Sequence, residues 1–129
     1  MQVRYYRKDD FPLIKAWGES FGANYTEEQF PPNGFIVEDV AAVFIYYTQS
    51  TVCFLENLIS NKNSEKEKRE KAIDLLVNEA FFEAQNAGFK VIYSTTNIPQ
   101  VITRAIKHGA TVQAGQALLT KTLNPSNDG

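Results

Sequence analysis

The sequence is poor in the residues that build disulfides and metal centres. Its 129 residues include a single cysteine, Cys53, and a single histidine, His108. One cysteine excludes an internal disulfide, and one Cys and one His far apart in sequence do not form a metal-ligand cluster. Because Cys53 lies in an apolar run, we expect a small buried side chain in a reducing compartment; a nucleophilic thiol is the alternative.

Long apolar runs and an excess of basic residues are also missing. No run approaches the roughly 20 apolar residues that a membrane span requires. The segment Met1–Arg4 leads into a strand pattern rather than a signal peptide, so we expect a soluble, cytoplasmic protein without a membrane partner. The formal net charge of −2 and the pI near 5.4 argue against a nucleic-acid partner, whose binding face would be basic.

What is present is enough for one globular core. Apolar residues make up 43% of the chain, which at this length predicts a single domain over residues 1–123. The last residues, 124–129, have the polar composition of a flexible tail.

Three extended runs in the middle of the chain predict an antiparallel meander. The runs Gly34–Val37, Val40–Thr48 and Thr51–Ile59 are separated by two-residue polar breaks. Within the second run, Ala41–Tyr47 is apolar on both faces, so we expect a central strand that is covered on both sides.

Helices are predicted before and after this meander. A strand over Gln2–Tyr6 precedes a helix that begins at Asp9 or Asp10 and ends near Ser20, with an apolar stripe of Leu13, Ile14, Trp17 and Phe21. A second helix begins at Ser64, with Ser64 and Glu67 fitting a capping box, and ends at Gly88. One face of this helix is apolar and comprises Ala72, Leu76, Ala80 and Ala84.

The remainder predicts a strand, a helix and a hairpin. Lys90–Ser94 is strand-like, and Asn97 or Ile98 caps a helix with Pro99 in its first turn. Gly109 ends that helix. The segments 110–113 and 116–122 are expected to pair as a final hairpin.

This order of elements resembles the GNAT superfamily of acyl-CoA-dependent acyltransferases over about Gln2 to Leu123. The best local match is the segment from Gly88 to Tyr93 followed by Asn97, Pro99, Lys107 and Gly109. The resemblance implies an α/β (α+β) fold with a mixed, mostly antiparallel sheet of six to seven strands and helices on both faces. It also implies acetyl-CoA as co-substrate and a primary amine as acceptor.

The resemblance further implies a coenzyme site along one strand and the helix after it. The pantetheine amides would pair with the backbone of Leu58 and Ser60, and the diphosphate would lie at the helix N-terminus near Asn63, Ser64 and Lys66. Asn97 falls in the segment that family members pack beside the adenylate and pantetheine arm.

The chain departs from the family in its diphosphate loop. If the helix is aligned on Leu75 and Leu76, the family's glycine positions fall on Lys68, Glu70 and Ala72, and no glycine occurs between Gly34 and Gly88. A Cβ at these positions blocks the approach of phosphate to consecutive amides. The cationic residues Lys62, Lys66, Lys68 and Arg69 offer direct charge pairing in its place, or they form a solvated helix face.

Family members also suggest roles in catalysis. Glu56 is the only carboxylate in the fourth strand, where it would act as the general base for the acceptor ammonium, directly or through water, or else point to water at the sheet opening. The usual general-acid Tyr, four residues before the closing Gly, is Ala105 here. Tyr25, Phe30, Tyr46 and Tyr47 line an acceptor pocket or serve as ordinary packing.

Two functions follow as hypotheses. The first is a small GNAT-like N-acetyltransferase with Glu56 as its catalytic residue. The second is a catalytically inactive GNAT-fold binding or structural module, motivated by the missing glycines and tyrosine. A homodimer or another protein partner is compatible with either.

Overall fold

The computed structural model describes residues 1–96 and 98–123, which fall into two compact units, Met1–Ser94 and a second that begins at Thr95. The first unit contains all the strands assigned in the described residues: β1 (Val3–Tyr5), β2 (Gly34–Val37), β3 (Ala41–Tyr47), β4 (Val52–Ser60) and β5 (Val91–Tyr93). Its helices are α1 (Phe11–Glu19) and α2 (Lys66–Asn86), with short 3₁₀ turns at Lys8–Asp10 and Glu27–Gln29.

The strands form one mixed sheet in the order β1-β2-β3-β4-β5. The first four strands are antiparallel neighbours, which confirms the predicted meander, and β5 pairs with β4 in parallel after the α2 crossover. Every residue of β3 from Ala41 to Ile45 is buried, so the prediction of a central strand covered on both faces is also confirmed.

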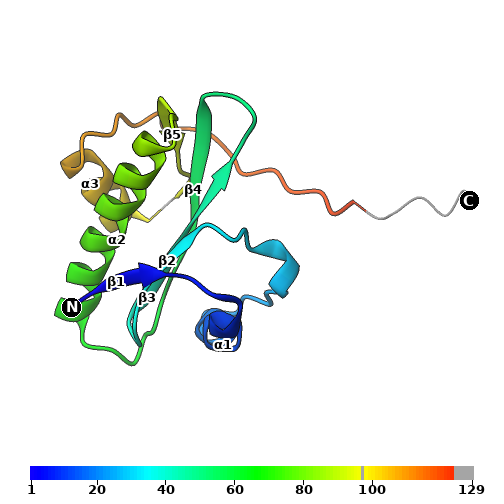
Figure 1. Cartoon of the computed structure of the whole chain (residues 1–129), viewed down its shortest axis with the longest axis vertical. Coiled ribbons are helices and arrows are strands. Elements are labelled where there is room, and N and C mark those ends of the chain that lie inside the picture. The colour runs from blue at the N-terminus through cyan, green and yellow to red at the C-terminus, as the bar shows by residue number, and fades with distance from the viewer. Residues whose placement is uncertain (97, 124–129) are drawn as a thin grey trace, which may run out of the picture. The chain divides into compact units, whose positions relative to one another are not determined.

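Helices α1 and α2 lie on opposite faces of this sheet (Figure 1). On the α2 face, the predicted apolar stripe of Ala72, Leu76, Ala80 and Ala84 is fully buried against the odd-numbered residues of β3. On the α1 face, Ile14 and Trp17 pack with Ile36, Phe44 and Ile59. The predicted stripe of α1 was wrong in one residue: Phe21 is 63% exposed because the helix ends at Glu19.

An ion-pair network fixes the start of α1. The Arg4 guanidinium donates two hydrogen bonds to the Asp10 carboxylate, at 2.7 and 2.9 Å, and a third to Glu38 at 2.8 Å. Asp10 also accepts the Arg7 backbone N–H at 2.7 Å. The hydrogen bonds from Arg4 hold the pKa of Asp10 below its usual range.

The second unit contains α3 (Pro99–Lys107), with Ile98 as its N-cap and His108 as its C-cap. Gly109 follows at φ +92°, which a glycine adopts without strain, so the predicted end of this helix is confirmed. The other predicted cap, Asn97, lies outside the described residues.

The predicted final hairpin is wrong. No strand is assigned over 110–123, and the sheet therefore has five strands rather than six to seven in the described part of the chain. Leu118 and Leu119 are 77% and 90% exposed. A lone two-stranded hairpin is marginal in water unless a third strand or a helix buries one of its faces, so the two segments alone do not produce it. No helix in the described residues is long and apolar enough to cross a membrane.

Candidate functional site

The edge of β4 is open over more than half of its length. β5 pairs only with Val52, Cys53 and Phe54, whereas β4 continues to Ser60. Beyond Phe54, no strand assigned in the described residues lies on the side of β4 that faces away from β3. This edge is therefore a place where an extended ligand can hydrogen-bond to backbone.

The alternation of backbone direction identifies the exposed groups of this edge. Asn61 N–H donates to the Val40 carbonyl oxygen at 2.8 Å, so the backbone of Asn61 points toward β3. In an antiparallel pair, successive residues point their N–H and C=O groups to alternate sides. The backbone of Ser60, and that of Leu58 two residues earlier, is thereby directed to the open edge.

A β-bulge interrupts β4 next to this edge. Glu56 pairs with Phe44 and Ile59 pairs with Ala42, so two residues of β4 face the single residue Val43 of β3. Asn57 has a φ of +56°, in the left-handed region. Among non-glycine residues Asn tolerates this region best, because its short polar side chain can hydrogen-bond locally.

The bulge places two consecutive polar side chains on the α1 face. Glu56 lies there because its cross-strand partner, Phe44, belongs to the α1-face core. The Asn57 side chain lies there too, since its amide Nδ2 donates to the hydroxyl of Tyr46, a strand residue packed on the same core. A regular strand would have turned Asn57 to the opposite face.

Tyr46 connects this bulge to the segment after α1. Its hydroxyl donates to the backbone carbonyl of Gln29 at 2.9 Å while it accepts from Asn57. Burial raises the pKa of Tyr46, and the Glu56 carboxylate adds to the rise, while the hydrogen bond from Asn57 opposes it. The hydroxyl is therefore protonated at neutral pH, as donation to Gln29 requires.

Two aromatic rings lie beside Glu56 where β4 and β5 stop pairing. Phe54 and Tyr93 are the last cross-strand pair, with ring centroids 5.8 Å apart. They are 39% and 55% exposed, unlike the fully buried Phe44. A carboxyl-bearing strand with exposed aromatic surface next to it suits an amine attached to an apolar body.

The N-terminus of α2 differs from its prediction. The N-cap is Glu65, without a side-chain cap hydrogen bond, so the predicted capping box of Ser64 and Glu67 is wrong. The Ser64 hydroxyl instead donates to the Asn61 carbonyl at 2.6 Å. The first-turn amides of a helix, here those of residues 66–68, have no intrahelical acceptor, and no side chain caps them.

The loop before α2 is closed by Asn61. Its side-chain oxygen accepts the Asn63 N–H at 3.0 Å, and its carbonyl accepts the Ser64 N–H at 3.0 Å. Its amide nitrogen donates to the Asp39 carbonyl at 2.9 Å, which ties the loop to the β2–β3 turn. The predicted contacts of Asn63 and Ser64 with a diphosphate through their amides therefore require this turn to open.

Arg69 strengthens the same turn from inside α2. Its guanidinium Nη1 donates to the carbonyls of Lys62, at 3.1 Å, and of Ser64. The positions that align with the family's glycines, Lys68, Glu70 and Ala72, all lie within α2. The helix thus begins earlier than a loop with glycines at those positions would allow. The amide donors lie at 66–68.

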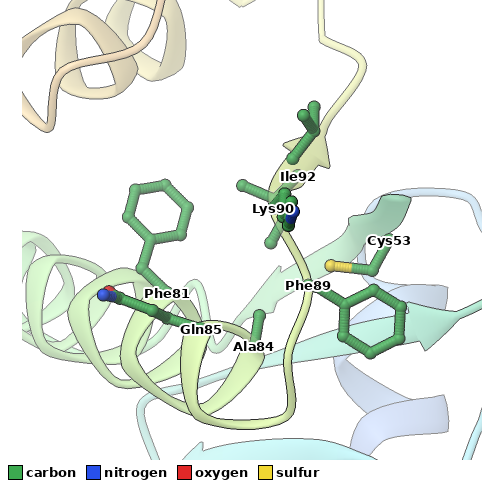
Figure 2. Close-up of a pocket in the computed structure, with 8 residues that line it drawn as sticks. Cys53, Phe81, Ala84, Gln85, Phe89, Lys90 and Ile92 are labelled. Carbon is green, nitrogen blue, oxygen red and sulfur yellow. The ribbon is translucent and has the colours of Figure 1, made fainter. Parts of the chain in front are cut away.

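A hollow of about 390 Å³ lies at the opposite end of β4. Figure 2 shows it between the C-terminal turns of α2 and the segment from Phe89 to Ile92. Cys53 is part of its wall and is fully buried, and burial raises the pKa of its thiol. The structure thus agrees with the expected buried small side chain. No group of three or more potential metal ligands occurs in the described residues.

Some of the site could be anticipated and some was missed. Glu56, Leu58 and Ser60 all belong to β4, and their roles in catalysis and coenzyme binding stay predictions. Tyr47, proposed with Tyr46 as a pocket residue, lies on the other face and stacks on Phe89 at 4.7 Å. Sequence reasoning gave Asn57 no role, although an Asn inside an apolar strand is depleted enough to indicate a bulge.

Comparisons with known proteins concern the fold. No family model matches the sequence, and no curated protein matches it. The structure, however, is similar to solved acetyltransferases and their relatives. Rv2747 from Mycobacterium tuberculosis, solved in complex with CoA, matches with a TM-score of 0.74 at 13% identity, over 92% of this chain and 76% of that one.

Two further matches are named acetyltransferases. An aminoglycoside acetyltransferase from an uncultured soil metagenomic sample, in complex with sisomicin, gives a TM-score of 0.64 at 12% identity, over 95% of this chain and 96% of the other. The ribosomal-protein-S18-alanine N-acetyltransferase from Escherichia coli gives 0.67 at 10% identity, over 84% and 76%. The chain therefore has the α+β fold of the GNAT acetyltransferases over nearly its whole length.

Proposed function

We propose that this protein is an N-acetyltransferase that moves the acetyl group of acetyl-CoA to a primary amine. The observation that carries the proposal is the open edge of β4, which begins where β5 stops pairing and has Glu56 beside it. The fold it shares with solved acetyltransferases, and with Rv2747 solved in complex with CoA, supports the proposal.

The coenzyme would be held at two places. The backbone of Leu58 and Ser60 at the open edge would pair with the pantetheine amides, as an added strand pairs with a sheet edge. The uncapped amides of residues 66–68 would receive the diphosphate, helped by the helix dipole and by the exposed ammonium of Lys66. Asn97, predicted beside the coenzyme, lies outside the described residues.

The reaction would then proceed by direct transfer. Glu56, directly or through water, takes a proton from the acceptor ammonium, and the free amine nitrogen attacks the thioester carbonyl. The developing oxyanion is stabilised by a strand N–H. As the C–S bond breaks, the attacking nitrogen loses its second proton to solvent and the amide forms. The CoA thiolate leaves and takes its proton from solvent, because Ala105 stands where the family has its usual acid. A thiol with a pKa of about 8.5 can leave as the thiolate without a general acid.

A titration of thermal stability with acetyl-CoA tests coenzyme binding. Free ligand at one hundred times its Kd should add about 2.7 kcal/mol to the free energy of unfolding. Lys66→Glu should weaken binding roughly fivefold, about 1 kcal/mol, by placing negative charge at the diphosphate. Lys90→Glu, which makes the same charge change beside the start of β5, is the matched control and should bind as wild type does. No stabilisation at millimolar acetyl-CoA would refute the proposal.

One observation favours the inactive binding module as a second candidate. The amides of Asn63 and Ser64 are already used inside the loop, so α2 offers the diphosphate fewer donors than an open loop would. If this candidate is correct, the purified protein releases no CoA from acetyl-CoA with any amine. In size exclusion of an extract of its host, the protein elutes together with a partner. A partnerless monomer that turns over acetyl-CoA excludes it.

A further inference from the structure

The hydrogen bond between Asn57 and Tyr46 joins three segments that are distant in sequence. Asn57 lies in the bulge of β4, Tyr46 lies on the neighbouring strand β3, and Gln29, which accepts the Tyr46 hydroxyl, ends the 3₁₀ turn after α1. Both side chains are half-buried. Packing alone requires neither the Tyr46 hydroxyl nor the Asn57 amide, since two apolar side chains of similar size would fill the same space.

The bond between Asn57 and Tyr46 lies next to Glu56 in the chain. Glu56 directly precedes Asn57, and the bulge is what keeps the two side chains on the same face. A residue at φ +56° lies in a sparsely populated region, and such conformations persist where the surroundings hold them. The Tyr46 hydroxyl supplies that hold from the side of the sheet to which Glu56 is directed.

We infer that Tyr46 and Asn57 are positioning residues: their hydrogen bond fixes the bulge that directly follows Glu56 and so holds the Glu56 carboxylate in place on the α1 face, beside the open edge of β4. The inference rests on the proposed acyl transfer. Neither residue exchanges a proton with the substrate. Their loss leaves the coenzyme contacts at α2 intact but allows the Glu56 carboxylate to turn away from the acceptor amine.

Three variants and a matched control test this role. Tyr46→Phe removes the hydroxyl, and Asn57→Gly removes the amide while glycine still adopts the positive φ. The double variant removes both partners. Tyr47→Phe deletes the same group from the adjacent residue of β3, on the opposite face, where the ring stacks on Phe89. Rates are referred to the folded fraction, measured by circular dichroism.

In steady-state assays of CoA release, each single variant should lower kcat by about tenfold or more, the effect expected of a misplaced catalytic group. The KM for acetyl-CoA should change less than kcat, since the diphosphate site at residues 66–68 is untouched and only the pantetheine contact of Leu58 lies in the bulge. The double variant should be no slower than the slower single variant, because both substitutions break one bond. Additive losses, an equal loss in Tyr47→Phe, or an unchanged kcat would overturn the inference.

Hydrogen exchange separates this inference from the proposed function. If the wild-type protein neither binds nor turns over acetyl-CoA, the proposed function fails. The bulge is then judged from exchange of the Ile59 amide, which follows the bulge and is directed to β3 beside Ala42. Tyr46→Phe and Asn57→Gly should speed this exchange by about tenfold or more, while Tyr47→Phe leaves it unchanged. Exchange that is the same in all variants overturns the positioning role, whether or not the enzyme is active.

Discussion

The packing of α2 against the sheet is tested by truncating one leucine and its exposed neighbour. Leu76 is fully buried in the α2-face core, whereas the adjacent Leu75 is 39% exposed. The core around Leu76 includes Val43, Ile45 and Leu55, all from strands that cannot collapse into the space without losing register. Leu76→Ala should therefore cost about 3 kcal/mol of unfolding free energy, within the range for buried leucines.

The magnitude for Leu75→Ala is much smaller. The Leu75 side chain buries less apolar surface than that of Leu76. We therefore expect Leu75→Ala to lower the free energy of unfolding by about 0.5 kcal/mol or less, as surface substitutions generally do. Urea denaturation followed by circular dichroism measures both, and the denaturant dependence should be unchanged in each variant. For a protein of this length, the Leu76→Ala loss corresponds to a melting temperature lower by about 12 °C.

This pair of variants also bears on the site, because the packing of α2 sets where its N-terminal amides lie. Equal losses in Leu76→Ala and Leu75→Ala would refute the assignment of the buried face. A loss below about 1 kcal/mol in Leu76→Ala would refute the close packing between α2 and β3.

Three more predictions concern the base, the acid limit of stability and a tight contact. Glu56→Gln should lower kcat at neutral pH by about 10²-fold, as expected for a lost general base. A fall of less than about threefold in CoA-release assays would contradict this role. Asp10→Asn should cost about 1–2 kcal/mol at pH 7, since it breaks a partly buried bond to Arg4. Because the pKa of Asp10 is lowered in the folded state, that stabilisation is present above the unfolded pKa of about 4 and disappears as the pH falls through the folded pKa. The unfolding free energies of variant and wild type, measured in urea, should therefore converge in acid. A difference that stays constant with pH would contradict the prediction. Gly34→Ala should cost about 1–3 kcal/mol in thermal or urea unfolding, because a Cβ there would lie 2.6 Å from the buried ring of Phe44; a neutral result would show that this ring can move.

Local patterns in the sequence predicted most of the elements. The extended runs with their polar breaks predicted the meander, and the continuous apolar run Ala41–Tyr47 predicted its buried centre. The four-residue spacing of Ala72, Leu76, Ala80 and Ala84, close to the helical repeat, predicted the packed face of α2. These patterns succeed because burial of a regular strand or helix follows its own period, whatever it packs against.

The candidate site depended on contacts between distant residues. The structure places the N-cap of α2 at Glu65 and not at the predicted Ser64, because the Ser64 hydroxyl donates to the Asn61 carbonyl. That loop is itself held by the β2–β3 turn. The final hairpin failed because its pattern alone does not supply a surface to bury it.

The sequence by itself determined that a carboxylate, Glu56, stands in the fourth strand of a GNAT-like order of elements. Only the tertiary structure decided which polar side chain shares a face with that carboxylate. A one-residue bulge after Glu56 puts the Asn57 side chain on the same face. The group that it contacts there is a hydroxyl of β3, at Tyr46, which the neighbours of Asn57 in sequence do not reveal.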